Sequence, residues 1–220
     1  MRRMERLLVN EIFRSLQGEG TRTGRACVFV RLTGCNLRCS WCDTAYAYEE
    51  GREMTIGEIV AEVRRVGGPL VCLTGGEPLV QAAAPALLAG LCDADFEVLL
   101  ETNGSMDISR LDERVARCVD VKCPGSGMAG SMLWSNLDGL RASDEVKFIL
   151  AGRADYDYAR RVIDEHGLGG RCPVIFTPAG GRLEARELAA WMLADENLPP
   201  AARLGIQLHK VLWPGMERGV

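Results

Sequence analysis

The stretch GCNLRCSWCDTAYA, residues 34–47, decides how the rest of the chain is interpreted. It places Cys35, Cys39 and Cys42 in the spacing C-x3-C-x2-C. Structural zinc sites close around four ligands, whereas three neighbouring thiolates suit three irons of a four-iron, four-sulfur cluster and leave the fourth iron open. The spacing therefore predicts such a cluster with one free iron position. A zinc site made of the three cysteines and His209 is the alternative.

Polar and glycine-rich motifs follow several apolar, β-branched runs. Cys35 follows the run at 26–34, GGEP occupies 75–78 and ETNG occupies 101–104, each at the end of a predicted strand. In βα barrels the carboxyl ends of the strands share one rim, and that rim carries the chemistry. The agreement of several motifs on one rim predicts an active site there. Later predicted strands end at further polar positions, Lys122 and Thr177-Pro178.

Strand-like runs alternate with helical patterns, which predicts βα units and a mostly parallel sheet. The predicted strands cover 9–16, 26–34, 69–75, 96–104, 118–124, 144–152, 172–179 and 203–209. The predicted helices cover 56–66, 83–93, 154–166 and 183–194, the first with Thr55 and Glu58 in capping-box spacing. A full eight-stranded barrel takes about 250 residues. The 220 residues therefore predict one α/β domain over 1–220, a partial TIM-like (β/α)6 barrel.

Composition sets limits on partners and compartment. The formal net charge of -4 argues against a general electrostatic grip on nucleic acid. No apolar run reaches the 18 or so residues of a membrane helix, and the first residues do not have the pattern of a signal peptide. A disulfide framework uses an even number of cysteines in a small chain, whereas this chain has nine, so reduced thiols are expected. We therefore predict a cytoplasmic protein without nucleic-acid or membrane partners.

The cysteine spacing resembles that of the radical S-adenosylmethionine (SAM) superfamily, and TGGEP at 74–78 resembles its glycine-rich motif. The resemblance implies a radical SAM barrel with a cluster-binding loop over 35–42, whose open iron binds SAM. One electron from the reduced cluster would then generate a 5′-deoxyadenosyl radical. The resemblance and the strand-end positions together give the predicted SAM contacts: Trp41, Cys42, Asp43, Gly75, Gly76, Glu77, Glu101, Asn103, Asp120, Val121, Lys122 and Thr177.

Some of these positions have alternatives or depart from the pattern. Trp41 could pack over the cluster and exclude solvent, or lie beside the adenine. Asp120-Val121-Lys122 stands where many related chains have Ser-Pro-Lys, so the lysine is kept and the serine is not. Thr177 lies in a segment where other members have Gln-Pro. Cys123, which follows Lys122, is not expected to be a fourth cluster ligand, because the chemistry needs an open iron.

A longer stretch, EIFRSLQGEGTRTGRACVFVRLTGCNLRCSWCDTAY at 11–46, closely resembles the 7-carboxy-7-deazaguanine synthase family. The similarity resumes at LTGGEPLVQ, ETNG and DVKCPGSGM, and returns in the C-terminal LHKVLWPGMERGV. The resemblance implies a carbon–nitrogen lyase that contracts 6-carboxy-5,6,7,8-tetrahydropterin to 7-carboxy-7-deazaguanine with loss of ammonia, in queuosine and 7-deazapurine biosynthesis. It further implies a homodimer, a flavodoxin or ferredoxin reductant, and a C-terminal tail that closes over the site.

The same resemblance gives a Mg2+ ligand, Thr44, and a set of substrate contacts. The predicted substrate contacts are Leu16, Gln17, Gly18, Glu19, Arg31, Thr74, His209 and Val220. The residue types suit this role, because an amide and a carboxylate at 17 and 19 can pair with the lactam and guanidine-like edge of a pterin. A guanidinium at 31 matches a carboxylate, and a hydroxyl suits Mg2+.

Each of these residues also has a structural alternative. QGEG at 17–20 could be a plain glycine-rich turn, and Arg31 could form an ion pair at the edge of the core. Thr44 could cap a helix or turn, and His209 could be a structural residue. Two other functions compete at the level of the chain: another radical SAM enzyme, such as an activase that installs a glycyl radical, and a non-catalytic zinc protein.

Overall fold

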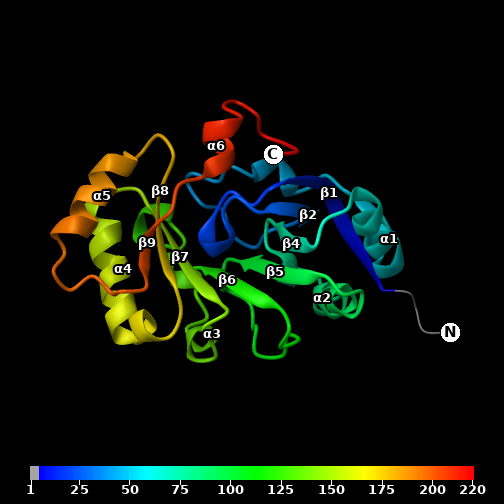
Figure 1. Cartoon of the computed structure of the whole chain (residues 1–220), viewed down its shortest axis with the longest axis horizontal. Helices are drawn as coiled ribbons and strands as arrows, with labels where there is room; N and C mark the ends of the chain where they lie inside the picture. The colour runs from blue at the N-terminus through cyan, green and yellow to red at the C-terminus, as the bar shows by residue number, and fades with distance from the viewer. Residues whose placement is uncertain (1–4) are drawn as a thin grey trace.

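A computed structural model describes residues 5–220 of the chain (Figure 1). Nine strands form one sheet in the order β3-β1-β2-β4-β5-β6-β7-β8-β9. Their bounds are β1 Arg6–Leu16, β2 Ala26–Leu32, β3 Arg52–Thr55, β4 Leu70–Gly75, β5 Glu97–Thr102, β6 Ala116–Asp120, β7 Glu145–Leu150, β8 Val174–Pro178 and β9 Ala202–Leu204. The α-helices are α1 Ile56–Val66, α2 Ala84–Asp93, α3 Ser135–Asp138, α4 Arg153–Glu165, α5 Ala185–Ala194 and α6 Leu208–Leu212.

The sheet is an open, curved, mostly parallel layer. From β2 through β4 and onward to β9, neighbouring strands pair in parallel. Strand β1 is antiparallel to both β2 and β3. Helices α1 and α2 lie outside one end of the arc and α4 and α5 outside the other (Figure 1). Among the described strands, β3 and β9 each have one neighbour, so the sheet does not close. The predicted partial barrel of mostly parallel strands is confirmed.

Two apolar layers hold the sheet. The larger lies between the strands and the outer helices, and the smaller lies on the inner face, where Phe29, Cys72 and Leu99 stand side by side on β2, β4 and β5. All six cysteines outside the cluster motif are buried, as expected for small hydrophobic residues. In the part of the chain that the structure describes, no helix is long and apolar enough to span a bilayer.

The predicted helices are confirmed to within a few residues, and α1 begins with the predicted capping box, in which Thr55 accepts from the Glu58 amide. Two strand predictions need correction. The edge strand β3 was not predicted, because its charged sequence REMT lacks an apolar run. The predicted strand 203–209 is wrong: β9 ends at Leu204, and His209 lies on the short helix α6.

Candidate active site

A cavity of about 510 Å³ opens at the carboxyl ends of the parallel strands. Twenty of the predicted site residues line it: Leu16, Gln17, Gly18, Glu19, Arg31, Cys35, Cys39, Trp41, Cys42, Asp43, Thr44, Thr74, Gly75, Gly76, Glu101, Asn103, Asp120, Lys122, His209 and Val220. The remaining three, Glu77, Val121 and Thr177, are buried behind its wall. Residues spread over most of the chain therefore converge on one space, as the strand-end argument predicts.

The three motif cysteines line the same part of this cavity. Cys42 is exposed, whereas Cys35 and Cys39 are partly buried, and burial raises the pKa of both thiols. The loop that carries them is held by the Ser40 hydroxyl, which donates to the Gly125 carbonyl at 3.0 Å. The loop thus places three thiols in the lining of one cavity.

The donor set fits a cluster, in which each thiolate binds its own iron. Cys123 is not available as a fourth ligand, because it is 1% exposed and its thiol lies 3.9 Å from the Val121 carbonyl. Within residues 5–220, no group of three or more His, Cys, Asp or Glu side chains could hold a single metal ion. The zinc site with His209 therefore gains no support from the geometry.

The glycines of GGEP bring the end of β4 against the cluster loop. A Cβ on Gly75, which has φ +154°, would lie 2.3 Å from the Leu32 carbonyl oxygen. A Cβ on Gly76 would lie 2.3 Å from the Gly34 oxygen and 2.6 Å from Cys35 Cβ. Only glycine allows this approach. The motif is therefore fixed directly beside the first cluster cysteine.

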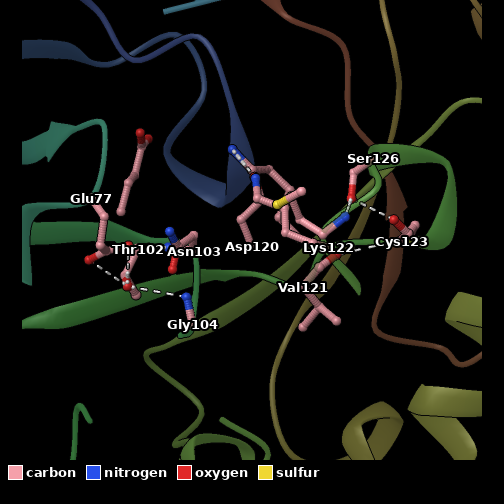
Figure 2. A network of polar contacts seen from close by, with 12 residues as sticks. Glu77, Thr102, Asn103, Gly104, Asp120, Val121, Lys122, Cys123 and Ser126 are labelled. Atoms are coloured by element: carbon pink, nitrogen blue, oxygen red, sulfur yellow. Dashed lines mark hydrogen bonds and ion pairs between the residues drawn. The ribbon is translucent and has the colours of Figure 1, made fainter. Parts of the chain in front are cut away.

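Glu77, the acid of GGEP, ties two motifs together from behind the wall (Figure 2). Its fully buried carboxylate accepts from the Leu79 amide at 3.0 Å, the Thr102 hydroxyl at 2.9 Å and the Asn103 amide at 2.6 Å. Burial raises the pKa of Glu77, and these donors partly offset the rise. In this structure its carboxylate serves the backbone of ETNG, and the predicted contact of Glu77 with SAM stays a prediction.

Glu101, the acid of ETNG, joins two predicted substrate residues. Its carboxylate accepts from the Gln17 amide nitrogen at 3.1 Å and from the Thr74 hydroxyl at 2.9 Å. Asn103 turns toward the cluster loop and donates to the Asn36 side chain at 3.1 Å. The end of β5 thus connects the residues predicted for SAM with those predicted for the substrate.

The segment between β1 and β2, residues 17–25, contributes Gln17, Gly18 and Glu19 to the lining of the cavity, and we call it the floor. Glu19 accepts from Lys147 on β7 and, at 2.8 Å, from the Gln207 side chain. Burial alone would raise the pKa of Glu19, but Lys147 and Gln207 outweigh it and lower the pKa below its ordinary value. The carboxylate is therefore ionised in the floor of the cavity.

A line of alternating charges runs from this floor. Lys147 lies 3.9 Å from Asp120. Asp120 in turn accepts from Lys122 at 2.8 Å, and Figure 2 shows these two residues together. Burial lowers the pKa of Lys147, but the Glu19 and Asp120 carboxylates offset this and raise it well above its ordinary value. Sequence reasoning missed Lys147 and Gln207. The first lies in an apolar strand run, and the second belongs to the segment wrongly predicted as a strand.

Val121 and Thr177 flank this line without reaching the cavity. Val121 is buried, and its amide donates to the Lys147 carbonyl at 2.9 Å. Thr177 is 1% exposed, and its hydroxyl has no hydrogen-bond partner among the described residues. The predicted contacts of Val121 and Thr177 with SAM stay predictions.

Arg31 and Thr44 lie on one side of the cavity. The Arg31 Nε donates to Glu11 at 2.8 Å, and the Tyr46 hydroxyl donates to the same oxygen. The ion pair that was the alternative for Arg31 is thus present, while the guanidinium still lines the cavity. Thr44 precedes a short 3-10 helix without capping it, and its hydroxyl donates to Asp43 at 3.0 Å.

The C-terminal segment docks over the floor. The Leu208 amide donates to the Gly18 carbonyl at 3.0 Å, and Lys210 pairs with Asp43 at 2.8 Å. Burial lowers the pKa of His209, so its ring is neutral near pH 7. Further along, Arg218 pairs with Glu50 at 2.9 Å, and Val220 reaches the cavity wall.

Comparisons with known proteins agree on one relationship. The Radical SAM superfamily model matches residues 29–165. A protein of Koribacter versatilis named 7-carboxy-7-deazaguanine synthase is 43% identical, covering 96% of this chain and 99% of its own. A protein of the same name from Chlorobaculum tepidum is 45% identical over 97% of both chains. The crystal structure of QueE from Escherichia coli has a similar fold, with a TM-score of 0.72, 24% identity, and coverage of 93% of this chain and 95% of its own.

Proposed function

The chain belongs to the radical SAM superfamily and, within it, to the family of 7-carboxy-7-deazaguanine synthases, and from this premise we propose its reaction. The substrate is 6-carboxy-5,6,7,8-tetrahydropterin, and the products are 7-carboxy-7-deazaguanine and ammonia, in queuosine biosynthesis. Product and ammonia together contain the atoms of the substrate, so the reaction is a carbon–nitrogen lyase step without a net oxidant. The observation that carries the proposal is that the cluster cysteines and the QGE floor share one cavity.

Superfamily membership implies a four-iron, four-sulfur cluster and SAM. Cys35, Cys39 and Cys42 would hold the cluster. When bound, cluster and SAM would supply the radical chemistry, namely hydrogen-atom abstraction at C6 of the pterin and return of that hydrogen. The chain's own residues have to orient the pterin, keep water out and hold its charges during this exchange.

The floor residues would bind the pterin ring. The ionised Glu19 can accept N–H donors from the guanidine-like edge, and Gln17 can pair with the lactam. Gln17 is held by Glu101, so its amide has one orientation. Burial of these groups strengthens each hydrogen bond to the ligand. The docked C-terminal segment, with His209 and Val220, would close the site over the substrate.

The substrate carboxylate would lie between Arg31 and Thr44. The guanidinium offers charge and paired donors, and Mg2+ held by the Thr44 hydroxyl and waters would neutralise a second oxygen. Thr44 now donates to Asp43 and would have to turn its lone pair toward the metal. The substrate carboxylate would lose hydration on entering the cavity, so it needs cations such as the Arg31 guanidinium beside it.

SAM would lie between the cluster loop and the ends of β4 to β6. Support comes from Gly75 and Gly76 beside Cys35, from Glu101 and Asn103, and from the pair of Asp120 and Lys122. A flavodoxin or ferredoxin would reduce the cluster in the cytoplasm. The open sheet edges β3 and β9 favour a homodimer, because unpaired edges tend to be covered.

The test is an anaerobic turnover experiment. Enzyme with a reconstituted cluster is given SAM, dithionite, Mg2+ and 6-carboxytetrahydropterin, and 7-carboxy-7-deazaguanine is sought by mass spectrometry. We expect product from the wild type and none from Cys39→Ala. If 5′-deoxyadenosine accumulates without product, the substrate assignment is wrong and another radical SAM reaction, such as glycyl-radical activation, gains ground. If an iron-loaded sample forms neither species, the catalytic proposal fails.

A further inference from the structure

We propose that Lys147 is a positioning residue that fixes the Glu19 carboxylate and thereby sets the preference for ligands with an N–H-rich edge. The inference rests on the proposed function and deepens it. It names a residue that acts through Glu19 and predicts which ring edge the site rejects. Lys147 lies at the centre of β7, which is not a neighbour of β1 in the sheet, so it reaches the floor segment from the opposite side.

The first argument is the placement of the charge. Lys147 is 7% exposed and still lines the cavity. Its ammonium contacts Glu19 and lies 3.9 Å from Asp120, so it is shared between the floor and the strand that leads to Lys122. A buried ion pair is seldom the best way to stabilise a core, because desolvation opposes it. A charge kept at the wall of a cavity is better explained by what binds there.

The second argument is that β7 holds the floor at two points. Two residues before Lys147, Glu145 accepts from the Thr21 amide at 2.7 Å. Gly20 packs so closely on Glu145 that a Cβ would lie 2.2 Å from its carboxylate oxygen. Side chains two apart on a strand face the same side. One strand therefore holds both the backbone and the acid of the floor segment.

The third argument is that both Glu19 oxygens have a fixed donor. Lys147 takes one oxygen, and Gln207 reaches the other from the opposite side at 2.8 Å. Each carboxylate oxygen keeps a lone pair for a ligand. Held in this way, Glu19 can only accept, so a ring edge that presents N–H groups is bound and one that presents carbonyl oxygens is repelled. Such a site rejects the wrong edge strongly, because a ligand carbonyl oxygen would face the carboxylate with no hydrogen bond between them.

The experiment measures binding as well as turnover. Cluster-loaded enzyme is titrated with 6-carboxypterin, which carries a 2-amino group, and with 6-carboxylumazine, which has a 2-oxo group instead. Wild type should bind the amino compound at least about tenfold more tightly. Lys147→Met should weaken binding of 6-carboxypterin and raise KM for the tetrahydropterin by about 10- to 100-fold. The variant should also reduce the ratio of the Kd values for the two compounds. In the absence of substrate, its rate of SAM cleavage should stay within about twofold of the wild-type rate.

Three further variants separate positioning from a purely structural role. Lys147→Arg keeps the charge and should recover part of the lost affinity. The double variant Lys147→Met, Glu19→Gln should bind 6-carboxypterin no worse than Glu19→Gln alone, because on this proposal Lys147 influences that ligand through Glu19. Arg65→Met, which breaks an exposed ion pair on α1, is the matched control and should bind like the wild type.

The outcomes are distinguishable. If wild type makes product and Lys147→Met keeps normal affinity and preference, the inference is overturned and the proposed function stands. An equal loss of SAM cleavage in Lys147→Met would overturn it too. If wild type neither binds 6-carboxypterin nor makes product, the proposed function itself fails. If Lys147→Met does not fold, Lys147→Arg is the deciding variant. Its altered geometry should raise the Kd of 6-carboxypterin about threefold or more. Unchanged binding would contradict the proposal.

Discussion

Glu19 and Glu77 each follow a glycine in a short loop, in QGEG and in GGEP. Glu77 is fully buried and the Glu19 side chain is 14% exposed, and their surroundings differ in kind. Glu77 bonds to uncharged donors of the chain itself, two backbone amides and a hydroxyl, and does not line the cavity. Glu19 bonds to a buried ammonium and an amide and faces the cavity. The pKa of the first is raised and that of the second is lowered.

The difference shows how one residue type, glutamate, can have two different roles. A carboxylate whose acceptor sites are filled by backbone amides organises loops and has little left for a ligand. A carboxylate paired with a cation keeps its charge in a low-dielectric space and has lone pairs to spare. The comparison thus separates an acid that holds the site together from one that meets the substrate.

The largest expected effect is on stability, from Glu77→Leu. This change leaves the amides of Leu79 and Asn103 and the Thr102 hydroxyl without their buried acceptor. We expect the free energy of unfolding to fall by on the order of 4 kcal/mol. Urea denaturation followed by circular dichroism measures it. A loss below about 1 kcal/mol would show that Glu77 does not hold the two motifs together.

Glu19→Gln should act chiefly on the ligand. Losing the charge removes the acceptor for the guanidine-like edge, so KM for the tetrahydropterin should rise about 10- to 100-fold, as expected for hydrogen bonds to a charged group. The loss of stability should be smaller than for Glu77→Leu, because Lys147 keeps Asp120 nearby. Steady-state kinetics with a parallel melting curve tests both parts. A variant that unfolds readily and binds normally would reverse the assignment of the two acids.

Opposite pKa shifts predict opposite pH dependence. The pKa of Glu19 lies below its ordinary value of 4.5, so its stabilising effect exists above pH 4.5 and is lost as the pH falls through the folded pKa. The pKa of Glu77 is raised, so its contribution is full below 4.5 and is lost as the pH rises through the folded pKa. Urea unfolding between about pH 3 and 7 compares the stability of the wild type with that of each variant. The difference from Glu19→Gln should shrink only below the ordinary pKa of 4.5, whereas the difference from Glu77→Gln should grow as the pH falls. Parallel curves would contradict the contrast.

The smallest effect is expected at the edge of the site, from Lys210→Met. Lys210 pairs with Asp43 at 2.8 Å, and both side chains are nearly half exposed. With the Thr44 and Gln207 bonds, this pair outweighs burial and lowers the pKa of Asp43. We expect a loss of only about 0.5 kcal/mol in stability. Substrate KM should change about twofold or less, and a large rise would assign the C-terminal segment a bigger share in binding.

Much of the fold and the site could be predicted from sequence because parallel strands end at one edge. Cys35, GGEP and ETNG were placed on a common rim by that rule alone, and all three meet at the cavity. The start of α1 was predictable for a local reason too, since its capping box involves residues three apart. Such features depend on neighbours in sequence or on the period of a strand.

The parts that escaped prediction depend on distant partners. RLGIQLH alternates like a strand, but pairing stops at Leu204, and Gln207 and Lys210 turn to Glu19 and Asp43 instead. Lys147 sits within an apolar run, and only the register of β7 against β6 places it beside Asp120. No local pattern in the sequence reports these contacts.

The floor of the cavity also has consequences for the order of folding. Glu19 is separated from Lys147 by 128 positions in the sequence and from Gln207 by 188. Contacts of such separation form late, because loop closure has to precede the gain from pairing. During synthesis from the N-terminus, the cluster loop and β4 emerge well before α6 does. We therefore expect the cluster loop, on the side of the exposed Cys42, to stay accessible to iron and sulfide until the C-terminal segment docks. The chain would then receive its cluster before this segment covers the site.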